Sequence, residues 1–455
     1  MKTICLSLLL AFPGLAASSP DRLVVHEWGT FTSIQDESGR TLGSINSDDE
    51  ALPAFTHELG YFHRLKPGEL PPLTYQGAPP SYPAATMRLE TPVVYFHPPK
   101  SMPLPIMADV KVSFYSGWLT QFYPDAACET NGFSSNGRLG NRVSPGWLKW
   151  TGLKIGGTKS GPETTEHVWT APRAVNAASV TTQAGESEKF LFYRGVGQLD
   201  APLRVSQAGT AADRWAIQGN WHPLPPASER GVSGRKREEG RAVVPGSAMT
   251  IEKLWLAQFH SDGSCAYRVL DPMTVRAGET TNILQTMPAS FSATEFSSAN
   301  LKRLQADMRV ALVKDGLFVD EADALLNTWE LSYFRSWGCR LFFLVPSAWT
   351  DERLPIEISV PNDITRVMVG RIELVTPEHR ALLRQLAKAS VPEQPWAHYA
   401  TVGNRRVLQG TMPAVYRDLG RFRNALILEE AAQRPTASLS QFIRLNGLEA
   451  STPLE

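Results

Sequence analysis

The stretch LVVHEWGTFTSI, residues 23–34, is rich in β-branched and aromatic residues and predicts a long β-strand. Side chains along a strand point alternately to the two faces of the sheet. His26 and Trp28 are therefore expected on one face, and Glu27 on the other face together with Phe31. Because both faces carry large apolar side chains, the strand is expected inside the protein, with the carboxylate of Glu27 on a buried face.

Strand-like stretches recur through the first two-thirds of the chain, bounded by glycine, proline or polar turn residues. The Asp-Gly pair at residues 262–263 predicts a hairpin. The apolar run CRLFFLV, residues 339–345, predicts a strand that is buried on both faces. Beyond the first strand, we expect strands at residues 91–97, 110–115, 188–196, 203–205, 214–218, 250–260, 265–270, 339–345, 356–360 and 366–374.

A helical pattern appears near residue 296, where apolar residues begin to recur every three or four positions. Helices are predicted at residues 298–316, at 320–329, from Pro377 onward and at 413–434. Strands followed by helices indicate an α+β fold. We expect a β-rich, sandwich-like N-terminal two-thirds and a C-terminal third that mixes helix and strand.

These patterns divide the 455-residue chain into four segments. They are a signal peptide (residues 1–17), a β-rich region (18–290), a mixed helix-strand region (291–390) and a helical C-terminal segment (391–455). A single interwoven domain is the alternative to separate domains.

The N-terminus has the organisation of a secretory signal peptide. Lys2 precedes the apolar run ICLSLLLAF, and small residues follow, which predicts cleavage near Ala17 or Ser18. The apolar run is too short to span a bilayer, and no later run approaches the roughly 20 residues that a span needs. We therefore predict a periplasmic or secreted protein without an integral membrane span.

The composition narrows the classes of partner. Lys and Arg total 45, and Asp and Glu also total 45, so the chain has no positive excess to attract nucleic acid. Twelve tryptophans and 34 prolines suit a loop-rich exported β protein or, equally, a protein that binds a glycan, and we favour the simpler interpretation that the tryptophans form an ordinary aromatic core. The oligomeric state is not predicted.

Three cysteines remain after cleavage: Cys128, Cys265 and Cys339. An oxidising compartment permits a disulfide, and the odd number leaves one thiol over. We favour a bridge between Cys265 and Cys339, because both lie in strand-like segments.

Glu27 is the first candidate catalytic residue. A carboxylate on an apolar, buried face costs several kcal/mol unless it is paired. Such a group is either held by an arginine or poised as an acid or base. Arg194, in the strand-like segment EKFLFYRGVG, is the predicted partner of Glu27. Glu90, which is close in sequence to several histidines, is a further candidate catalytic residue. A structural ion pair inside a sandwich is the alternative.

Histidines form a second candidate group. His26, His57, His63 and His97 all lie within the first 97 residues, with Glu27 among the carboxylates near them. Two or three histidines and a carboxylate suit a divalent metal such as zinc, with one position left open for water. We take His26, His57 and His63 as the candidate ligands. Surface or hydrogen-bonded histidines are the alternative.

Two further arrangements are open. Glu27 with Glu90 or Glu129 would supply the carboxylate pair of glycoside hydrolysis, although no spacing favours it. Arginines of the C-terminal segment either bind an anion or form a solvated helix face; they are Arg405, Arg406, Arg417, Arg421 and Arg423.

Four blocks resemble those of an uncharacterised family of exported bacterial proteins: HEWGTFT (26–32), RLETPVVYF (88–96), EKFLFYRGVG (188–197) and RVMVGRIELVTP (366–377). The resemblance spans most of the mature chain, and it implies export and a single architectural unit. It supplies no activity, cofactor or catalytic residue. It also implies an aromatic residue where this chain has His97, which argues against His97 as a metal ligand.

Two functions fit these features. One is a hydrolase, with or without a metal, that acts on an envelope or environmental polymer through a site around His26 and Glu27. The other is a non-catalytic binding or cell-envelope structural protein in which the same residues form a buried polar brace. The common motifs of zinc proteases, serine hydrolases, nucleotide-binding loops and dithiol enzymes do not occur in the sequence.

Overall fold

The computed structural model describes most of the chain after residue 21. The described residues are 22–46, 52–58, 81–129, 146–210, 212–224, 247–389, 414–445 and 448, with the backbone alone for 397–402 and 405–410. The predicted signal peptide lies outside these ranges. Among the helices that they contain, none has the length and apolar character needed to cross a membrane.

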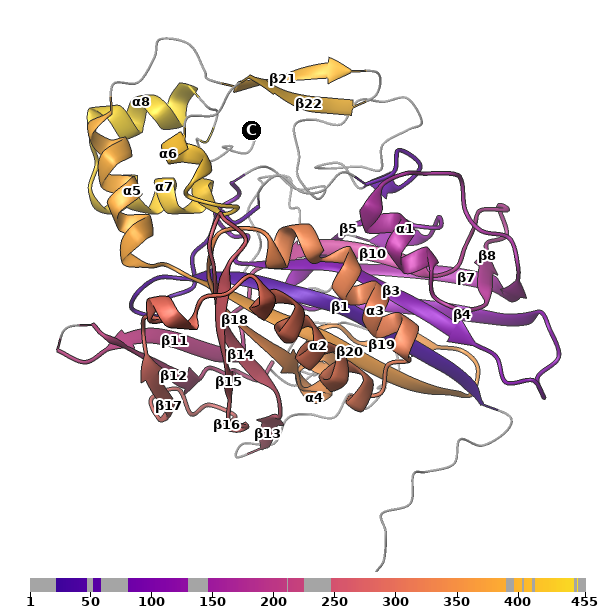
Figure 1. Cartoon of the computed structure of the whole chain (residues 1–455). Coiled ribbons are helices and arrows are strands. Elements are labelled where there is room, and N and C mark those ends of the chain that lie inside the picture. Colours follow the sequence, from indigo (N-terminus) through magenta and orange to yellow (C-terminus); the bar gives the residue numbers. More distant parts are fainter. Residues whose placement is uncertain are drawn as a thin grey trace, which may run out of the picture.

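A nine-stranded sheet forms the centre of the fold (Figure 1). Its middle strand is β1 (Leu23–Gln35), which pairs in parallel with β20 (Asn362–Leu374) on one side and antiparallel with β3 (Met87–His97) on the other. In spatial order the strands are β15 (Cys265–Leu270), β14 (Leu254–Phe259), β18 (Gly338–Val345), β20 (Asn362–Leu374), β1 (Leu23–Gln35), β3 (Met87–His97), β10 (Leu191–Gly197), β5 (Gly117–Tyr123) and β2 (His57–Glu58).

Smaller sheets accompany the central one. The six-stranded sheet contains β19 (Ile356–Ile358), β4 (Ile106–Phe114), β7 (Gly146–Gly157), β8 (Ser179–Thr181), β9 (Ser187–Glu188) and β6 (Ala127–Glu129). The other sheets consist of β11 (Leu203–Ala208), β12 (Arg214–Gly219) and β17 (Ile283–Pro288), of β13 (Ala248–Ile251) and β16 (Met273–Arg276), and of β21 (Ala397–Val402) and β22 (Arg405–Gly410).

Helices are concentrated in the C-terminal third, so the fold is α+β and β-rich, as predicted. Their bounds are α1 (His167–Arg173), α2 (Ala299–Lys314), α3 (Val319–Thr328), α4 (Ser347–Arg353), α5 (Pro377–Lys388), α6 (Ala414–Arg417), α7 (Arg423–Gln433) and α8 (Ala437–Leu445), with short turns of other helix types at Ala293–Glu295 and Glu330–Phe334.

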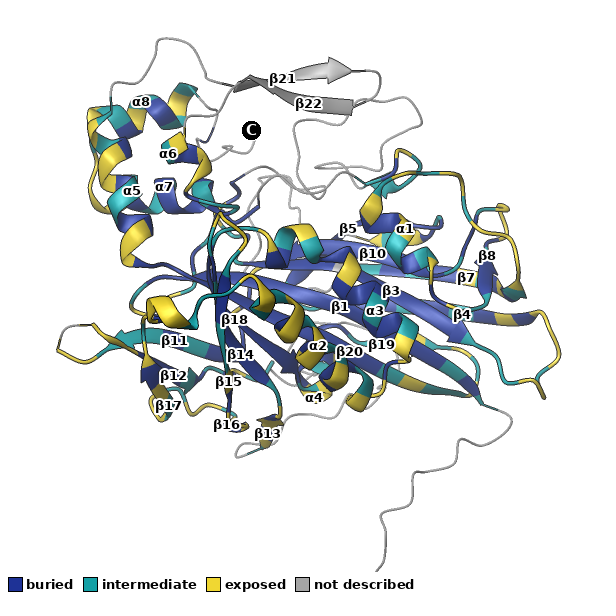
Figure 2. Cartoon of the chain, viewed as in Figure 1, coloured by how far each residue is buried: buried dark blue, intermediate teal, exposed yellow. Residues whose placement is uncertain are grey.

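The two faces of the central sheet are buried by different partners. Phe31 and Val25 of β1 pack into a core that also contains side chains of the six-stranded sheet, which makes a sandwich. Trp28 points the other way, into a second core with side chains of α2 and α3, and Figure 1 shows these two helices lying across the sheet. The strands β1, β3 and β10 are buried along nearly their whole length (Figure 2). The alternation predicted for residues 23–34 is therefore confirmed.

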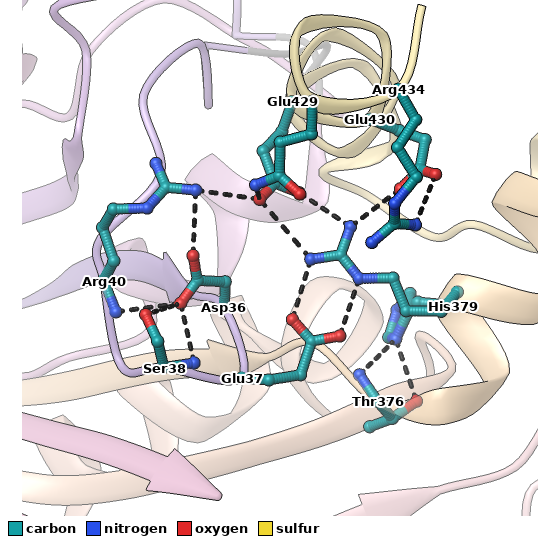
Figure 3. Close-up of polar contacts among 11 residues, drawn as sticks. Asp36, Glu37, Ser38, Arg40, Thr376, His379, Glu429, Glu430 and Arg434 are labelled. Atoms are coloured by element: carbon teal, nitrogen blue, oxygen red, sulfur yellow. Dashed lines mark hydrogen bonds and ion pairs between the residues drawn. The ribbon is translucent and has the colours of Figure 1, made fainter.

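The C-terminal helices α5–α8 gather at one end of the sheet (Figure 1). Arg380 of α5 joins them to the turn after β1: its Nε lies 2.6 Å from Oε1 of Glu37, and its Nη1 lies 2.8 Å from Oε2 of Glu429 on α7. Glu430 is a third carboxylate on the same guanidinium, at 3.1 Å. Figure 3 shows Glu37, Glu429 and Glu430 directed into this ion-pair network, which ties α5 and α7 to the sheet.

The predicted helix at 413–434 is wrong as one element, because the chain breaks between α6 and α7. Gly420 lies in this break with a φ of +78°, a left-handed conformation that glycine adopts at little cost. The sequence patterns also missed β5, β16, β17 and β7; the stretch of β7, GWLKWTGLKIGG, contains four glycines within twelve residues.

The predicted bridge between Cys265 and Cys339 is wrong, since neither cysteine forms a disulfide. Their strands, β15 and β18, pair with opposite edges of β14. Two steps of strand spacing put the cysteines about 10 Å apart, beyond the reach of a disulfide. The two thiols also belong to the cores on opposite faces of the sheet.

Candidate functional site

Glu27 lies in a closed polar network in the sandwich core. Its carboxylate accepts hydrogen bonds from Arg366 of β20 and from the hydroxyl of Tyr193, and the residue has no exposed surface. Arg366 also contacts Asp351, with 2.7 Å between Nη1 and Oδ1, and donates to the carbonyl of Leu354 at 2.6 Å. Each of these charged or hydroxyl groups around Glu27 therefore has an ionic or hydrogen-bonding partner. This is the arrangement expected of a buried ion pair with a structural role.

The predicted pair of Glu27 with Arg194 is wrong. Tyr193 of β10 faces Glu27, and Arg194, its neighbour in sequence, points to the opposite face of the sheet, where its Nε donates to the side chain of Gln121. The pairing of β10 with β3 and β5 is irregular at this point, with register shifts just before Gly195. Arg194 shares the face of Phe192, as alternation along the strand predicts, but that face packs against the helices and Glu27 is on the other face.

A cavity of about 850 Å³ lies on the helical side of the sheet, and Glu90 and Arg194 both line it. It is bounded by strands of the sheet, by the turn that follows α3 and by the C-terminal helices. We call it the Glu90 cavity. Its described lining residues are Glu90, Val168, Arg194, Ser261, Trp329, Leu331, Ser332, Arg335, Ser336, Trp337, Glu378, Ala381, Leu382, Arg417, Asp418, Gly420, Arg421 and Arg423.

Glu90 is 1% exposed, and both of its oxygens have partners. Oε1 lies 2.6 Å from Nη2 of Arg421 and 3.2 Å from Nε of Arg88. Oε2 accepts hydrogen bonds from the hydroxyls of Tyr333, at 2.7 Å, and Thr32, at 2.9 Å. Burial, followed by the charge of Glu90, raises the pKa of Tyr333, so its hydroxyl remains a donor. Glu90 therefore fixes Arg421 at the wall of the cavity.

The lining of the Glu90 cavity is positively charged. Among the described residues, five arginines line it against three acidic residues, Glu90, Glu378 and Asp418. The carboxylate of Glu90 is already shared between two guanidinium groups. Arginine binds carboxylate, sulfate and phosphate groups with two parallel hydrogen bonds, so this lining suits an anion.

Two polar atoms in the wall of this cavity are shielded from bulk solvent and lack a hydrogen-bond partner among the described residues. They are the indole Nε1 of Trp329 and the hydroxyl of Ser332. Buried polar groups in proteins are nearly always hydrogen-bonded, because an unmade bond costs about 1–3 kcal/mol. A ligand oxygen in the cavity would satisfy either group.

A second polar group lies at the other end of α3. Nδ1 of His26 is 2.7 Å from Oε2 of Glu321, and Nε2 of His97 is 2.9 Å from Oε1 of the same carboxylate. Glu321 is fully buried. Burial raises its pKa, but the hydrogen bonds from the two histidines outweigh this effect and bring the pKa down to about 2. We call these three residues the His-Glu cluster.

The structure separates the predicted metal ligands. His57 pairs with Glu186, with 2.9 Å between Nε2 and Oε2, and does not join His26. His63 lies outside the described residues. His97, which the family resemblance argues against, is the histidine that joins His26, and Glu321 was missed because it lies 295 positions from His26 in the chain.

The remaining candidate residues from the sequence, Glu129 and the C-terminal arginines, lie at different places in the fold. Glu129 accepts a hydrogen bond from the indole of Trp147 at the exposed edge of the six-stranded sheet. Of the C-terminal arginines, Arg417, Arg421 and Arg423 line the Glu90 cavity, which favours the anion-binding alternative. The side chains of Arg405 and Arg406 lie outside the described residues.

Helix α3 connects the two candidate sites. Glu321 lies in its first turn, and Trp329 follows directly after its last residue. Eight residues at 1.5 Å each place the two ends about 12 Å apart. The His-Glu cluster and the Glu90 cavity are therefore distinct sites on one face of the sheet.

No protein-family model matches the chain, and no curated protein matches it. Among solved structures, it is similar to the Fcho1 Mu homology domain of Danio rerio with a bound Eps15 peptide. That likeness has 8% sequence identity and a TM-score of 0.25, over 80% of this chain and 98% of that chain. A likeness this weak supports no argument about fold or function.

Proposed function

We propose that this protein binds an acidic glycan, a sugar chain with carboxylate or sulfate groups, in the Glu90 cavity. Its place of action would be outside the cytoplasm, after removal of the predicted signal peptide. The observation that carries the proposal is the lining: five arginines, with the unpartnered Nε1 of Trp329 and hydroxyl of Ser332 beside them.

Guanidinium groups would bind the charged groups of such a ligand. Arg421 is the best placed of them, because Glu90 holds its Nη2 at 2.6 Å and so fixes its orientation in advance. A side chain that is already ordered loses less conformational entropy when a ligand binds. Trp329 and Ser332 would donate to the hydroxyl and ring oxygens that every sugar carries.

Apolar side chains in the same wall would contact the faces of the sugar rings. Trp329 and Trp337 line the cavity together with Leu331 and Leu382. Apolar surface combined with a few directional polar groups is the usual composition of a small-molecule or carbohydrate site. The mixture fits an acidic sugar better than a bare inorganic anion, which would leave the apolar wall without a partner.

Calorimetric titration of the purified protein with oligogalacturonate tests the proposal, with an uncharged oligoglucan of equal length as the comparison ligand. We expect binding of the acidic oligomer only, weakening as salt is added. Arg421→Gln should reduce the affinity at least about tenfold, because hydrogen bonds to charged groups contribute about 1.5–3 kcal/mol.

Arg309→Gln is the matched control, since Arg309 pairs with Asp323 and does not line the Glu90 cavity. Its affinity for the acidic oligomer should equal that of the wild type. Equal binding of the charged and uncharged oligomers, or equal losses in Arg421→Gln and Arg309→Gln, would overturn the proposal.

Hydrolysis of the bound polymer is the second candidate function. The observation in its favour is that Glu90, Glu378 and Asp418 bring three carboxylates to one cavity, and glycoside hydrolysis uses a pair. Glu90 has both oxygens occupied, so Glu378 and Asp418 are the accessible pair. Release of reducing ends by the wild type, lost in Glu378→Gln and in Asp418→Asn, would support hydrolysis. Binding without release would leave the binding function alone.

A further inference from the structure

The His-Glu cluster brings three metal-ligating side chains together from distant parts of the chain. His26 is on β1, His97 ends β3, and Glu321 is in the first turn of α3. One ligand atom from each lies within 4.8 Å of the others. Among the described residues, this is the group of histidine, cysteine and acidic side chains with metal-binding geometry.

Rigid elements hold all three ligands. The register of β1 with β3 pairs His26 with Tyr95 and Val24 with His97, so the two histidines are diagonal neighbours on one sheet face. Glu321 is oriented by a hydrogen bond of 2.7 Å from the backbone N–H of Phe318 to its Oε2. Hydrogen bonds that orient a ligating carboxylate in this way are typical of metal sites.

An aromatic ring covers the cluster. The ring of Phe318 lies 4.5 Å from the imidazole of His26 and 4.8 Å from that of His97, measured between centroids. Phe318 is itself 47% exposed and the side chain of His97 is 13% exposed, so the cluster lies close to the surface beside an apolar ring. Such a position shields coordination bonds from water and still gives an ion a short entry path.

We propose that His26, His97 and Glu321 bind one divalent transition-metal ion, zinc being the ion that suits this set best. Two imidazole nitrogens and one carboxylate oxygen are a common zinc donor set, with a water as the fourth ligand. Bonds of about 2.0–2.1 Å would set the three ligand atoms about 3.3 Å apart. The hydrogen-bonded distances of 2.7 and 2.9 Å, which run to different oxygens of Glu321, would widen when an ion enters, and the widest separation in the set, at most 4.8 Å, would shorten.

A zinc ion here would fasten helix α3 to the sheet. Its ligands come from the first turn of α3 and from two adjacent strands, and the other end of α3 leads into the wall of the Glu90 cavity. The ion would therefore stabilise the fold without touching the ligand of that cavity. The inference does not depend on the proposed function.

Zinc titration of the purified, chelator-treated protein tests the site. We expect one zinc per chain by calorimetry and elemental analysis, and a rise in the melting temperature when zinc is added. Co²⁺ should give the visible absorption of a four-coordinate site, and parallel titrations with Fe²⁺ and Mg²⁺ report the preference for the ion.

Two variants remove a ligand while keeping the local packing. Glu321→Gln retains an oxygen that can accept from the N–H of Phe318, and His97→Phe retains a ring against Phe318. Each should weaken zinc binding at least about 100-fold, since loss of an outer partner alone costs 10–100-fold. His57→Phe is the matched control, because His57 also pairs with a glutamate but lies outside the cluster.

The outcomes separate a metal site from a polar brace. A wild-type protein that binds no zinc, or that binds zinc as well after Glu321→Gln as before, overturns the proposal. Equal losses in His57→Phe and His97→Phe would do the same. Binding of the acidic oligomer by zinc-free protein keeps the two proposals distinguishable, since it tests the Glu90 cavity alone.

Discussion

Glu27 and Arg366 are register partners on the parallel strands β1 and β20, and they form an ion pair in the sandwich core although 339 positions separate them in the chain. Their side chains are 0% and 3% exposed. Burial lowers the pKa of Arg366, but its interactions with Glu27, Tyr193 and Asp351 together raise it overall, so the guanidinium stays charged. The pair joins the two strands through side chains as well as through the backbone.

Replacing one partner of this pair should be more damaging than replacing both. Arg366→Met leaves the carboxylate of Glu27 buried without a counter-charge, and it should lower the free energy of unfolding by about 3–5 kcal/mol. The double variant Glu27→Gln with Arg366→Met should recover part of that loss. Urea unfolding of the variants measures the effect, and a loss below about 1 kcal/mol in Arg366→Met would contradict it.

Gly195 of β10 cannot accept a side chain. A Cβ at this position would lie 1.7 Å from the carbonyl oxygen of Trp118 on β5, so the two strands would have to separate. Gly195→Ala should lower the free energy of unfolding by about 3 kcal/mol, and it should weaken the proposed binding of an acidic glycan, because Arg194 lines the Glu90 cavity. The control is Gly157→Ala, where the nearest side-chain atom would be 3.9 Å away. Thermal unfolding should separate the two variants; equal melting temperatures would argue against this packing.

His379 should make stability fall in mild acid. Burial lowers its pKa from 6.5 to about 4, with the charge of Glu373 acting in the opposite direction. Because the folded pKa is below the unfolded one, the unfolded chain takes up the proton first as pH falls. The contribution of His379 to the free energy of unfolding is therefore fully present above pH 6.5. It falls by roughly 3 kcal/mol between about pH 6.5 and 4.

His379→Gln isolates this effect from the other titrating groups. Nδ1 of His379 accepts from the backbone N–H of Thr376 at 3.1 Å, and the oxygen of glutamine can replace it at the start of α5. The variant should lose less stability than the wild type over the same pH range, measured by urea unfolding at several pH values. Identical pH profiles would show that His379 does not titrate as described.

Arg380 should control the attachment of the C-terminal helices. Arg380→Met removes the shared partner of Glu37, Glu429 and Glu430, and it leaves three carboxylates facing one another. Amides of α7 should then exchange their hydrogens faster than in the wild type, as followed by mass spectrometry.

Arg335→Met serves as the comparison, because Arg335 pairs with Glu330 and its side chain is 62% exposed. Exposed pairs contribute at most about 1 kcal/mol, so exchange in α7 should be unchanged. Unchanged exchange in Arg380→Met as well would mean that apolar contacts alone hold these helices.

Local patterns predicted the fold class, many of the strands and helices, and the faces of the first strand. The alternation of His26, Glu27 and Trp28 placed their side chains correctly, because burial on both faces leaves a strand little choice of register. The helix start at Thr376 and Pro377 was also found, since proline and the capping residues act locally.

Partnerships between distant residues could not be predicted in the same way. Glu90 and Arg194 were both candidates and do share a cavity, but Arg194 lies on the face of Phe192, which is opposite to the face that carries Glu27. Nothing near His26 in the sequence points to Glu321, and nothing near Glu27 points to Arg366. Such pairs depend on which strands and helices become neighbours, and that is decided by the packing of the whole chain.

The place of β1 in the middle of the central sheet also bears on the order in which the protein can fold. A growing chain makes β1 and β3 early, but β20, the partner on the other edge of β1, follows more than 300 residues later. Until then, that edge of β1 presents unpaired N–H and C=O groups, which can pair with another chain. Contacts between such distant segments also slow folding. Protein released from a stalled ribosome before residue 374 would therefore be prone to aggregate through the strand that lies at the centre of the finished fold.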